Sequence, residues 1–313
     1  MNSNGRLWIH RFALLTANCT FPLIFAGGLV TSTGAALAIP DWPTNYGFFL
    51  LPREHWIGNV IYEYGHRVIG AIVGLLTITL AVWIWFREPR RSVRWLALAA
   101  VVAVCIQGII GGMRVVLVNH FPALSAKLPI LHACLAQGFF AIAISLAQLT
   151  SPRWFSSAST TSSPPPYFRT VCLATTVLVY LQIFLGALTR HTTAGATAHI
   201  ITAFLVLAAA IAVLSVAMNH CPKDATVTRP ALLLGALLLA QLFLGFASLL
   251  LRSQRQPDLP ATASQALVPT AHVALGALIF ATSVILTLRA YQATNGASVS
   301  KANISSAPAH PTT

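Results

Sequence analysis

The chain has 313 residues, of which 56% are hydrophobic and only 8% are charged. About a quarter of the residues in a soluble domain are charged, so this composition excludes a protein that is surrounded by water. The 19 Lys and Arg residues outnumber the 6 acidic ones, but they lie in short segments between apolar stretches. This distribution argues against nucleic-acid binding and favours the topology signals of an integral membrane protein.

Eight apolar segments follow one another along the chain. A membrane-spanning helix needs about 20 mostly apolar residues, and each segment meets this length. The predicted spans are Leu14–Ser32, Val68–Phe86, Trp95–Val118, Ile130–Leu149, Thr170–Leu188, Ala198–Met218, Ala231–Leu251 and Ala266–Leu288. The first span follows Arg6 and Arg11 and resembles a signal peptide. It is longer than the apolar part of such a peptide, and we expect it to be retained.

The distribution of Lys and Arg predicts the orientation of the spans. Twelve of the 19 lie on the side that carries both chain ends, with the densest group at Arg87, Arg90 and Arg91. Cytoplasmic loops of membrane proteins are enriched in these residues. We therefore expect a multi-pass protein of a bacterial cytoplasmic (inner) membrane, with both termini in the cytoplasm and a long first loop outside.

A Ser- and Pro-rich segment divides the spans into two groups of four. We predict an N-terminal four-helix bundle in residues 1–150, a cytoplasmic linker in residues 151–166, a C-terminal four-helix bundle in residues 167–292 and a disordered tail in residues 293–313. The linker and the tail are both polar, in contrast to the apolar spans of the two bundles.

The two halves resemble each other in sequence. The segment Ile24–Leu29 matches Ile183–Leu188, and the motif that begins at Gln107 matches the motif that begins at Gln241. An even number of spans in each half makes both halves insert in the same sense. The predicted fold class is therefore an all-α integral membrane protein, with eight transmembrane helices arranged as two parallel-repeat four-helix bundles.

Four of the ten histidines begin even-numbered spans. They are His66 and His132 in the first half, and His199 and His272 in the second. The second and fourth helices of a four-helix bundle can face each other across its core. Two neutral imidazoles that face each other are suitable axial ligands of a haem iron. We therefore predict one haem site in each half, near the outer face of the membrane.

A haem held in this way would turn its carboxylates towards the outer interface. Arg67 and Arg114 in the first half, and Arg190 and Arg252 in the second, are placed to pair with them. Arginines at a membrane interface also serve as snorkelling anchors, and the sequence is compatible with both roles.

Glu63 distinguishes the two halves. It precedes His66 by three residues, so both side chains lie on one face of a helix, whereas the matching position before His199 is Ala196. A reaction needs a group that carries protons or stabilises charge, whereas an electron-transfer haem needs only its two ligands. We therefore predict that the first half is catalytic, with Glu63, His66 and His132 at its centre.

Several motifs together make the sequence similar to a known family, the haem A synthases. The resemblance runs from about Leu14 to Tyr291. The motifs that carry it are Gly27-Gly28-Leu29-Val30, Thr33-Gly34, Pro40-Asp41-Trp42-Pro43, Glu63-x-x-His66-Arg67, Gln107-Gly108-x-x-Gly111-Gly112, Leu131-His132, Gly186-Ala187-Leu188-x-Arg190-His191-Thr192, and His272 with Gly276-Ala277. No single motif identifies the family, but the combination is specific.

This resemblance implies a function. Haem A synthases oxidise one ring methyl group of haem O to a formyl group by successive hydroxylations, for haem A biosynthesis and cytochrome oxidase assembly. The family pattern implies a haem b cofactor, with its iron, at His199 and His272. It implies the substrate haem O at His66 and His132, beside Glu63. The implied partners are the lipid bilayer, the farnesyltransferase that produces haem O and an unidentified electron donor. The Gly-rich helix faces also allow a homo-oligomer.

The sequence departs from the family pattern in the first loop. Many members have a cysteine on each side of the Pro-Asp-Trp-Pro motif, where this chain has Ile39 and Asn45, so a disulfide is excluded there. Thr31 stands where many members have an arginine, although Arg190 is present in the second half. None of the five cysteines forms a Cys-x-x-Cys pair, so we predict neither a disulfide framework nor a zinc site.

Two other functions fit part of the pattern. A di-haem membrane protein that passes electrons from quinol to an acceptor would use the same four histidines, but it gives Glu63 no required role. A transporter built from parallel repeats would use the histidines as proton relays. However, no span is broken near its midpoint, and the ionisable groups gather at one interface. Glu63 therefore favours the enzyme over the electron-transfer protein, and the unbroken spans favour it over the transporter.

Overall fold

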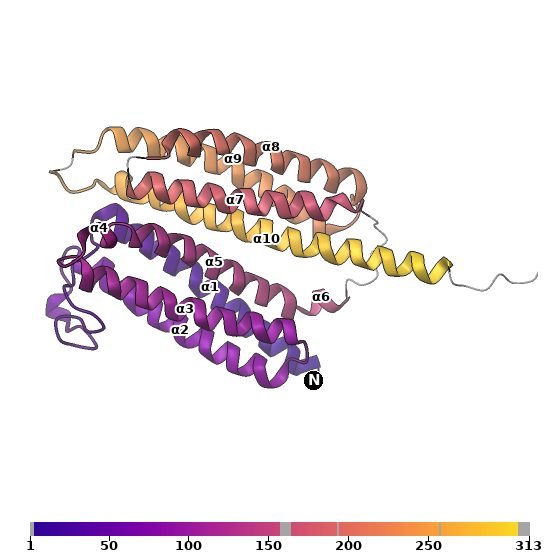
Figure 1. The fold of residues 1–313 in the computed structure, drawn as a ribbon, viewed down its shortest axis with the longest axis horizontal. Helices are drawn as coiled ribbons and strands as arrows, with labels where there is room; N and C mark the ends of the chain where they lie inside the picture. Colours follow the sequence, from indigo (N-terminus) through magenta and orange to yellow (C-terminus); the bar gives the residue numbers. More distant parts are fainter. Residues whose placement is uncertain (1–2, 157–163, 193, 257, 306–313) are drawn as a thin grey trace, which may run out of the picture.

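The computed structural model describes residues 3–156, 164–192, 194–256 and 258–305. Within these ranges the regular structure is helical (Figure 1). The long helices are α1 (Ser3–Thr33), α2 (Val60–Arg87), α3 (Arg91–Leu117), α5 (Leu128–Thr150), α7 (Tyr167–His191), α8 (Ala196–His220), α9 (Ala225–Ser253) and α10 (Ala263–Ser305). The short ones are η1 (Arg53–His55), α4 (Pro122–Ser125) and α6 (Pro152–Ser156).

The eight long helices confirm the predicted class of all-α membrane protein. Within the described part of the chain, eight helices are long and apolar enough to cross a membrane. The shortest, α5, has 23 residues, which corresponds to about 35 Å at 1.5 Å per residue and exceeds a hydrocarbon core of about 30 Å. Proline and glycine mark several ends, because α2 stops before Pro89 and Gly195, with φ of 85°, precedes α8.

The long helices form two groups of four. α1, α2, α3 and α5 pack around one apolar core, and α7, α8, α9 and α10 pack around another. The first group ends at Thr150 and the second begins at Tyr167. Both groups start from the same end of the molecule, on the right in Figure 1, where the end of α10 also lies. A parallel repeat that relates the two groups stays a prediction.

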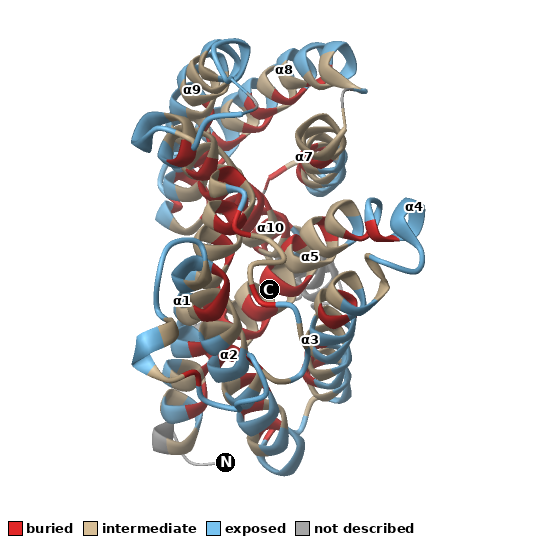
Figure 2. Cartoon of the chain, turned by 90° about the vertical axis from the view of Figure 1, so that its left-hand side faces the viewer, coloured by how far each residue is buried: buried red, intermediate tan, exposed pale blue. Residues whose placement is uncertain are grey.

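The two groups meet along four helices, α1 and α5 of the first group and α7 and α10 of the second. α1 and α5 contact α10, and α5 also contacts α7, so these helices occupy the middle of the end-on view in Figure 2. Ile24, Phe140, Ala277 and Ala281 form a separate buried cluster at this junction. Small residues from α10 allow it to pack closely against α1 and α5.

The predicted linker, residues 151–166, contains a short helix. Pro152 begins α6, which suits the first turn of a helix because proline lacks an amide hydrogen there. Gln292 of α10 donates a 2.6 Å hydrogen bond to the carbonyl of Trp154, and the guanidinium of Arg289 lies 5.5 Å from the Trp154 ring. Residues 157–163 of the linker lie outside the described residues.

The last helix continues beyond the predicted end of the second bundle. We predicted a disordered tail for residues 293–313, whereas α10 runs on to Ser305. The first proline after the bundle is Pro308, so no proline stops the helix before that point. The remainder of the predicted tail lies outside the described residues.

Candidate functional site

One large cavity connects the predicted site residues of both helix groups. Its volume is about 1650 Å³, which exceeds the roughly 300–1,000 Å³ of a typical small-molecule site. His66, His132, His199 and His272 all line it, together with Glu63. The structure therefore brings together five residues that are far apart in the sequence.

The four histidines form two pairs with nearly the same geometry. The ring centroids of His66 on α2 and His132 on α5 lie 6.4 Å apart, with an angle of 71° between the ring planes. Those of His199 on α8 and His272 on α10 lie 6.3 Å apart, with an angle of 81°. The pairs match those predicted from the sequence, and each belongs to one helix group.

The geometry of each pair fits a haem iron between its two rings. Bonds from imidazole nitrogen to zinc are about 2.0–2.1 Å long, and similar bonds to one iron would place two opposed ring centroids roughly 6 Å apart. Nδ1 of each of the four histidines is buried. Backbone groups of Leu23, Gln182 and Gln241 interact with the rings of His66, His199 and His272. One nitrogen of such a ring is oriented by the backbone, and the other is left for a metal ion.

Glycines let the rings approach the neighbouring helices. A Cβ atom added at Gly27 would lie 3.0 Å from Cε1 of His66, and one at Gly186 would lie 3.0 Å from Cε1 of His199. A Cβ at Gly245 would lie 3.1 Å from Cε1 of His272. These distances are shorter than ordinary contacts, so the three positions have no room for a larger residue without a shift of the ring.

Glutamine side chains fix the backbone that carries the histidines. Gln107 Nε2 donates to the carbonyl of His132 (3.0 Å), and Gln241 Nε2 donates to that of His272 (3.1 Å). Gln182 makes a matching bond of 2.8 Å to the carbonyl of His199. No role was predicted for Gln182. Its position, four residues before Gly186, was the available signal.

Glu63 is the buried carboxylate of the first pair. Only 6% of its surface is exposed. Its Oε1 accepts a 2.7 Å bond from Nη2 of Arg67, and its Oε2 accepts a 3.1 Å bond from the amide of Ile39. A buried carboxylate needs such partners. They hold it in one position at the wall of the cavity, one helical turn from His66.

Arg67 also ties the first loop, residues 34–59, to α2. Its Nη1 donates to the carbonyls of Asp41 (2.8 Å) and Thr44 (3.0 Å) and to Oδ1 of Asn45 (3.3 Å). Its Nη2 donates to the carbonyl of Ile39 (3.3 Å). The two positions that lack the family's cysteines are thus held to α2 by hydrogen bonds. A role of Arg67 in haem binding stays a prediction.

Trp42 of the first loop lies against α3. A Cβ atom added at Gly112 would collide with the indole of Trp42, and the indole also lines the cavity. The absence of a side chain at Gly112 therefore allows the loop to close over this part of the cavity.

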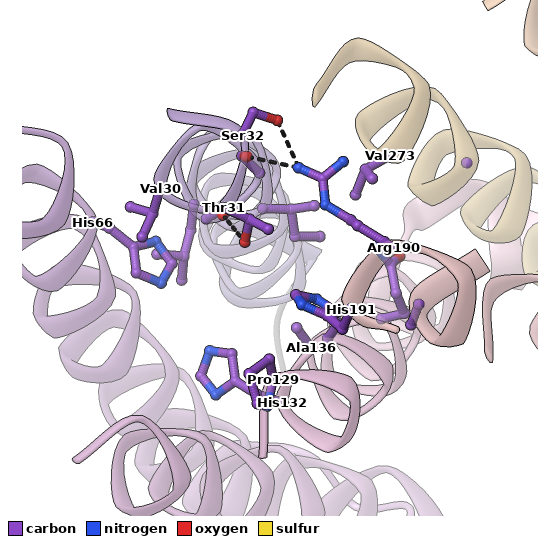
Figure 3. A pocket seen from close by; sticks show the side chains of 18 of the residues that line it. Val30, Thr31, Ser32, His66, Pro129, His132, Ala136, Arg190, His191 and Val273 are labelled. Carbon is purple, nitrogen blue, oxygen red and sulfur yellow. Dashed lines mark hydrogen bonds between the residues drawn. The ribbon is translucent and has the colours of Figure 1, made fainter. Parts of the chain in front are cut away.

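Arg190 links the second helix group to the first. Its Nη2 donates to the carbonyl of Gly28 (2.9 Å) and to Oγ of Ser32 (2.7 Å) (Figure 3), and its Nη1 donates to the carbonyl of Pro269 (3.3 Å). The adjacent His191 lines the cavity, and Figure 3 shows its ring on the side of Arg190 towards His132. The structure does not test the predicted role of Arg190 in haem binding.

The other two predicted arginines also line the cavity. Arg252 donates to the carbonyls of Thr189 (2.5 Å) and Thr192 (3.2 Å) at the end of α7. Arg114 lies on α3, in the first group, and its side chain is half-buried. Both arginines are therefore near enough to a ligand in the cavity to meet its carboxylates.

Comparisons with known proteins complete the description of the site. The sequence model of a family described as "Cytochrome oxidase assembly protein" matches residues 56–199, which include Glu63 and three of the four histidines. The Heme A synthase of Halalkalibacterium halodurans is 28% identical over 190 residues, which cover 58% of this chain and 59% of that protein.

Two further relatives carry the same description. The Heme A synthase of Shouchella clausii is 27% identical over 192 residues, or 59% of this chain and 60% of that protein. The Heme A synthase of Alkalihalophilus pseudofirmus is 32% identical over 107 residues, or 34% of this chain and 35% of that protein. The alignments thus cover less than two thirds of each relative's length.

Proposed function

Because the chain belongs to the haem A synthase family, we propose that it oxidises a ring methyl group of haem O to a formyl group by successive hydroxylations. It would act as an oxidoreductase of haem A biosynthesis, in the assembly of cytochrome oxidase. One observation carries this proposal. Two histidine pairs share the same geometry, but only the first has a buried carboxylate beside it.

In this proposal the first pair holds the substrate. His66 and His132 bind the iron of haem O, and Glu63 lies at the wall of the same cavity. Each hydroxylation would insert one oxygen atom of dioxygen into a C–H bond and reduce the other to water, with two electrons from the donor and two protons. The gem-diol formed by the second step loses water to give the formyl group. These steps move protons and develop charge near the reacting methyl group. A carboxylate that is already fixed by Arg67 and by the amide of Ile39 can accept a proton or stabilise positive charge without first reorganising.

The second pair would hold a haem b cofactor between His199 and His272. A bound haem supplies one electron at a time, which an unidentified electron donor would replenish. Ala196 occupies the position that matches Glu63. The backbone carbonyls of both ligands accept bonds from glutamine side chains. The glutamines orient the two ligands, and Ala196 supplies neither an acid nor a base. An electron-transfer site needs only its oriented ligands.

The orientation in the membrane belongs to the same proposal. Both chain ends would lie in the cytoplasm of a bacterium, so the first loop and the four histidines would be near the outer face. The excess of Lys and Arg on the side of the termini supports this arrangement. It would also give haem O access from the bilayer.

The Glu63→Gln variant tests the division of labour between the halves. We expect it to retain both haem ligands and to lose haem A formation by about 10²-fold or more, because general acid–base catalysis typically contributes 10²–10⁴-fold. The measurement is the haem content of the purified variant and the yield of haem A in cells.

Glu54→Gln is a matched control, because Glu54 is an exposed carboxylate in the first loop. It should keep full activity. Normal haem A formation by Glu63→Gln would show that the carboxylate is not required. If neither the wild type nor the Glu63→Gln variant oxidises haem O, although both bind haem, the result would instead support the electron-transfer function.

A further inference from the structure

A groove between α2 and α3 extends the cavity away from the first histidine pair. The groove is uncharged and contains three glycines. Six of the residues that line it are Gly70, Gly74 and Ile78 of α2, and Val104, Cys105 and Gly108 of α3. A Cβ atom added at Gly108 would meet no atom within 4 Å, and one at Gly74 would reach only ordinary contact with Val104, at 4.0 Å. Both glycines therefore have free space beside them.

The groove is continuous with the site of the first pair. His66 and Ile78 both lie on α2, and they are separated along it by about 18 Å at 1.5 Å per residue. The ring of His66 faces that of His132, with 6.4 Å between the ring centroids, so the haem site lies at the head of the groove. Ile78, Cys105 and Gly108 are exposed, which opens the other side of the groove to lipid.

The second helix group lacks the glycines of this groove. The contacts Gly27–His66 and Gly186–His199 align α2 with α8, and the bonds from Gln107 and Gln241 align α3 with α9. In this alignment the six positions are occupied by Ala203, Leu207, Ile211, Leu238, Leu239 and Leu242. Gly74 thus corresponds to Leu207, and Gly108 corresponds to Leu242. Of the six, only Ala203, Leu238 and Leu242 line the cavity.

We propose that the groove between α2 and α3 holds the isoprenoid tail of the substrate haem. This inference rests on the proposed function and adds a binding site for the part of haem O that distinguishes it from haem b. An uncharged groove that ends in lipid suits a long apolar substituent, because burial of each CH₂ group is favourable by about 0.8 kcal/mol. Small residues provide the room that such a chain needs beside packed helices.

The groove also explains why the two similar pairs take different haems. Both pairs offer two imidazoles at the same separation, so the ligands alone do not select between haem O and haem b. The first pair has a groove for the tail beside it. At the second pair the positions that match Gly74 and Gly108 carry leucines, which leave less room for a tail, so that pair suits a haem without one.

The Gly108→Leu variant tests the groove, because it introduces the residue that the second group has at the equivalent position. The purified full-length protein is titrated with haem O and, separately, with haem B, and binding is followed by the absorbance of the bis-histidine haem. The His66→Ala variant gives the signal of the second pair alone. Gly108→Leu should weaken haem O binding at the first pair about tenfold or more, and it should change haem B binding by less than about twofold.

Ala99→Leu is the matched control, because Ala99 is exposed on α3 and does not line the cavity. It should bind both haems as the wild type does. If Gly108→Leu fails to fold, Gly74→Leu tests the same space. Unchanged preference for haem O in a folded groove variant would overturn the proposal.

The binding test does not depend on turnover. A wild type that oxidises haem O, together with a groove variant that keeps its preference, would refute the groove and leave the proposed function intact. A wild type that binds haem O through the groove but forms no haem A would refute the proposed reaction and support the groove.

Discussion

Glycine controls the distance between each imidazole and the next helix. A Cβ atom at Gly186 would lie 3.0 Å from Cε1 of His199, which is closer than an ordinary contact, whereas one at Gly111 would lie 3.7 Å from Cε1 of His132, which is an ordinary contact. The same substitution at the two positions therefore has different consequences for the ligands.

We predict that Gly186→Ala loosens the second pair and that Gly111→Ala does not change the first. The His199 ring must shift in Gly186→Ala, at the cost of about 1–3 kcal/mol that is typical of overpacking. The measurement is the amount of haem extracted per purified protein. Equal haem contents of the two variants would contradict the role assigned to Gly186.

Asp41 organises the turn that follows it in the first loop. Partial burial acts to raise the pKa of Asp41, but hydrogen bonds from Thr44 Oγ1 (2.5 Å), Gly47 N (2.8 Å) and Tyr46 N (2.6 Å) outweigh it, so the pKa lies below its usual value of 3.8. A lower pKa in the folded state means that the ionised carboxylate stabilises the loop.

This pKa gives the loop a defined dependence on pH. The contribution of Asp41 is fully present above its usual pKa of 3.8, and it is lost as the pH falls through the lower pKa of the folded state. Fluorescence of Trp42 and Trp56 should report a loosened loop in the wild type only at pH values below 3.8. Asp41→Asn should be loosened already at neutral pH, and an acid transition that is identical in both proteins would contradict this role.

Residue types revealed the centre of the site, but not the hydrogen bonds around it. The four histidines were predicted because such groups are costly in a membrane protein and recur at equivalent positions. Glu63 was predicted because it is a carboxylate without a counterpart in the second half. The contacts of Arg67 with the carbonyls of Asp41 and Thr44 were not predicted, because they depend on the path of an irregular loop. Gln182 was missed because its role depends on the rotation of α7 against α8.

At the scale of the elements, Arg190 joins three helices. It lies on α7, and its guanidinium bonds to Gly28 and Ser32 of α1 and to Pro269 of α10. Hydrogen bonds to charged groups contribute about 1.5–3 kcal/mol each when they are buried. The planar guanidinium makes these bonds in directions that a lysine ammonium cannot reproduce.

We predict that Arg190→Lys lowers the free energy of unfolding by about 1.5–3 kcal/mol, which corresponds to the loss of at least one such bond. The measurement is thermal unfolding of the purified protein in detergent. Arg229→Lys is the control, because Arg229 is exposed on α9, and it should unfold as the wild type does. Equal unfolding temperatures for both variants would show that Arg190 does not hold the groups together.

The long elements were predictable, but their full extents were not. Hydrophobicity located all eight spans, because burial in lipid requires an apolar run of sufficient length. The predicted spans are shorter than the observed helices, because the helices continue into polar residues such as those at the start of α2. The short helices α4 and α6 were not predicted, because one turn or two carry no periodic pattern.

At the scale of the whole molecule, one fold provides two similar sites with different surroundings. The first pair has Glu63 and a groove of small residues beside it, whereas the second has Gln182 and leucines. The internal repeat predicted which histidines would pair. It did not predict that both pairs line one cavity, or that Arg190 bonds to the other helix group. A repeat shows which positions of the two halves are equivalent, but not which residues of one half contact the other.

The measurement that tests the central claim most directly is a haem extraction. The chain is expressed in a host that makes haem O but no haem A, and the membrane haems are separated by chromatography with mass detection. The account predicts haem A, or its hydroxymethyl precursor, in cells with the wild-type chain and neither in cells with His66→Ala. Haem B bound to the purified wild-type protein, with haem O left unchanged in the membranes, would contradict it.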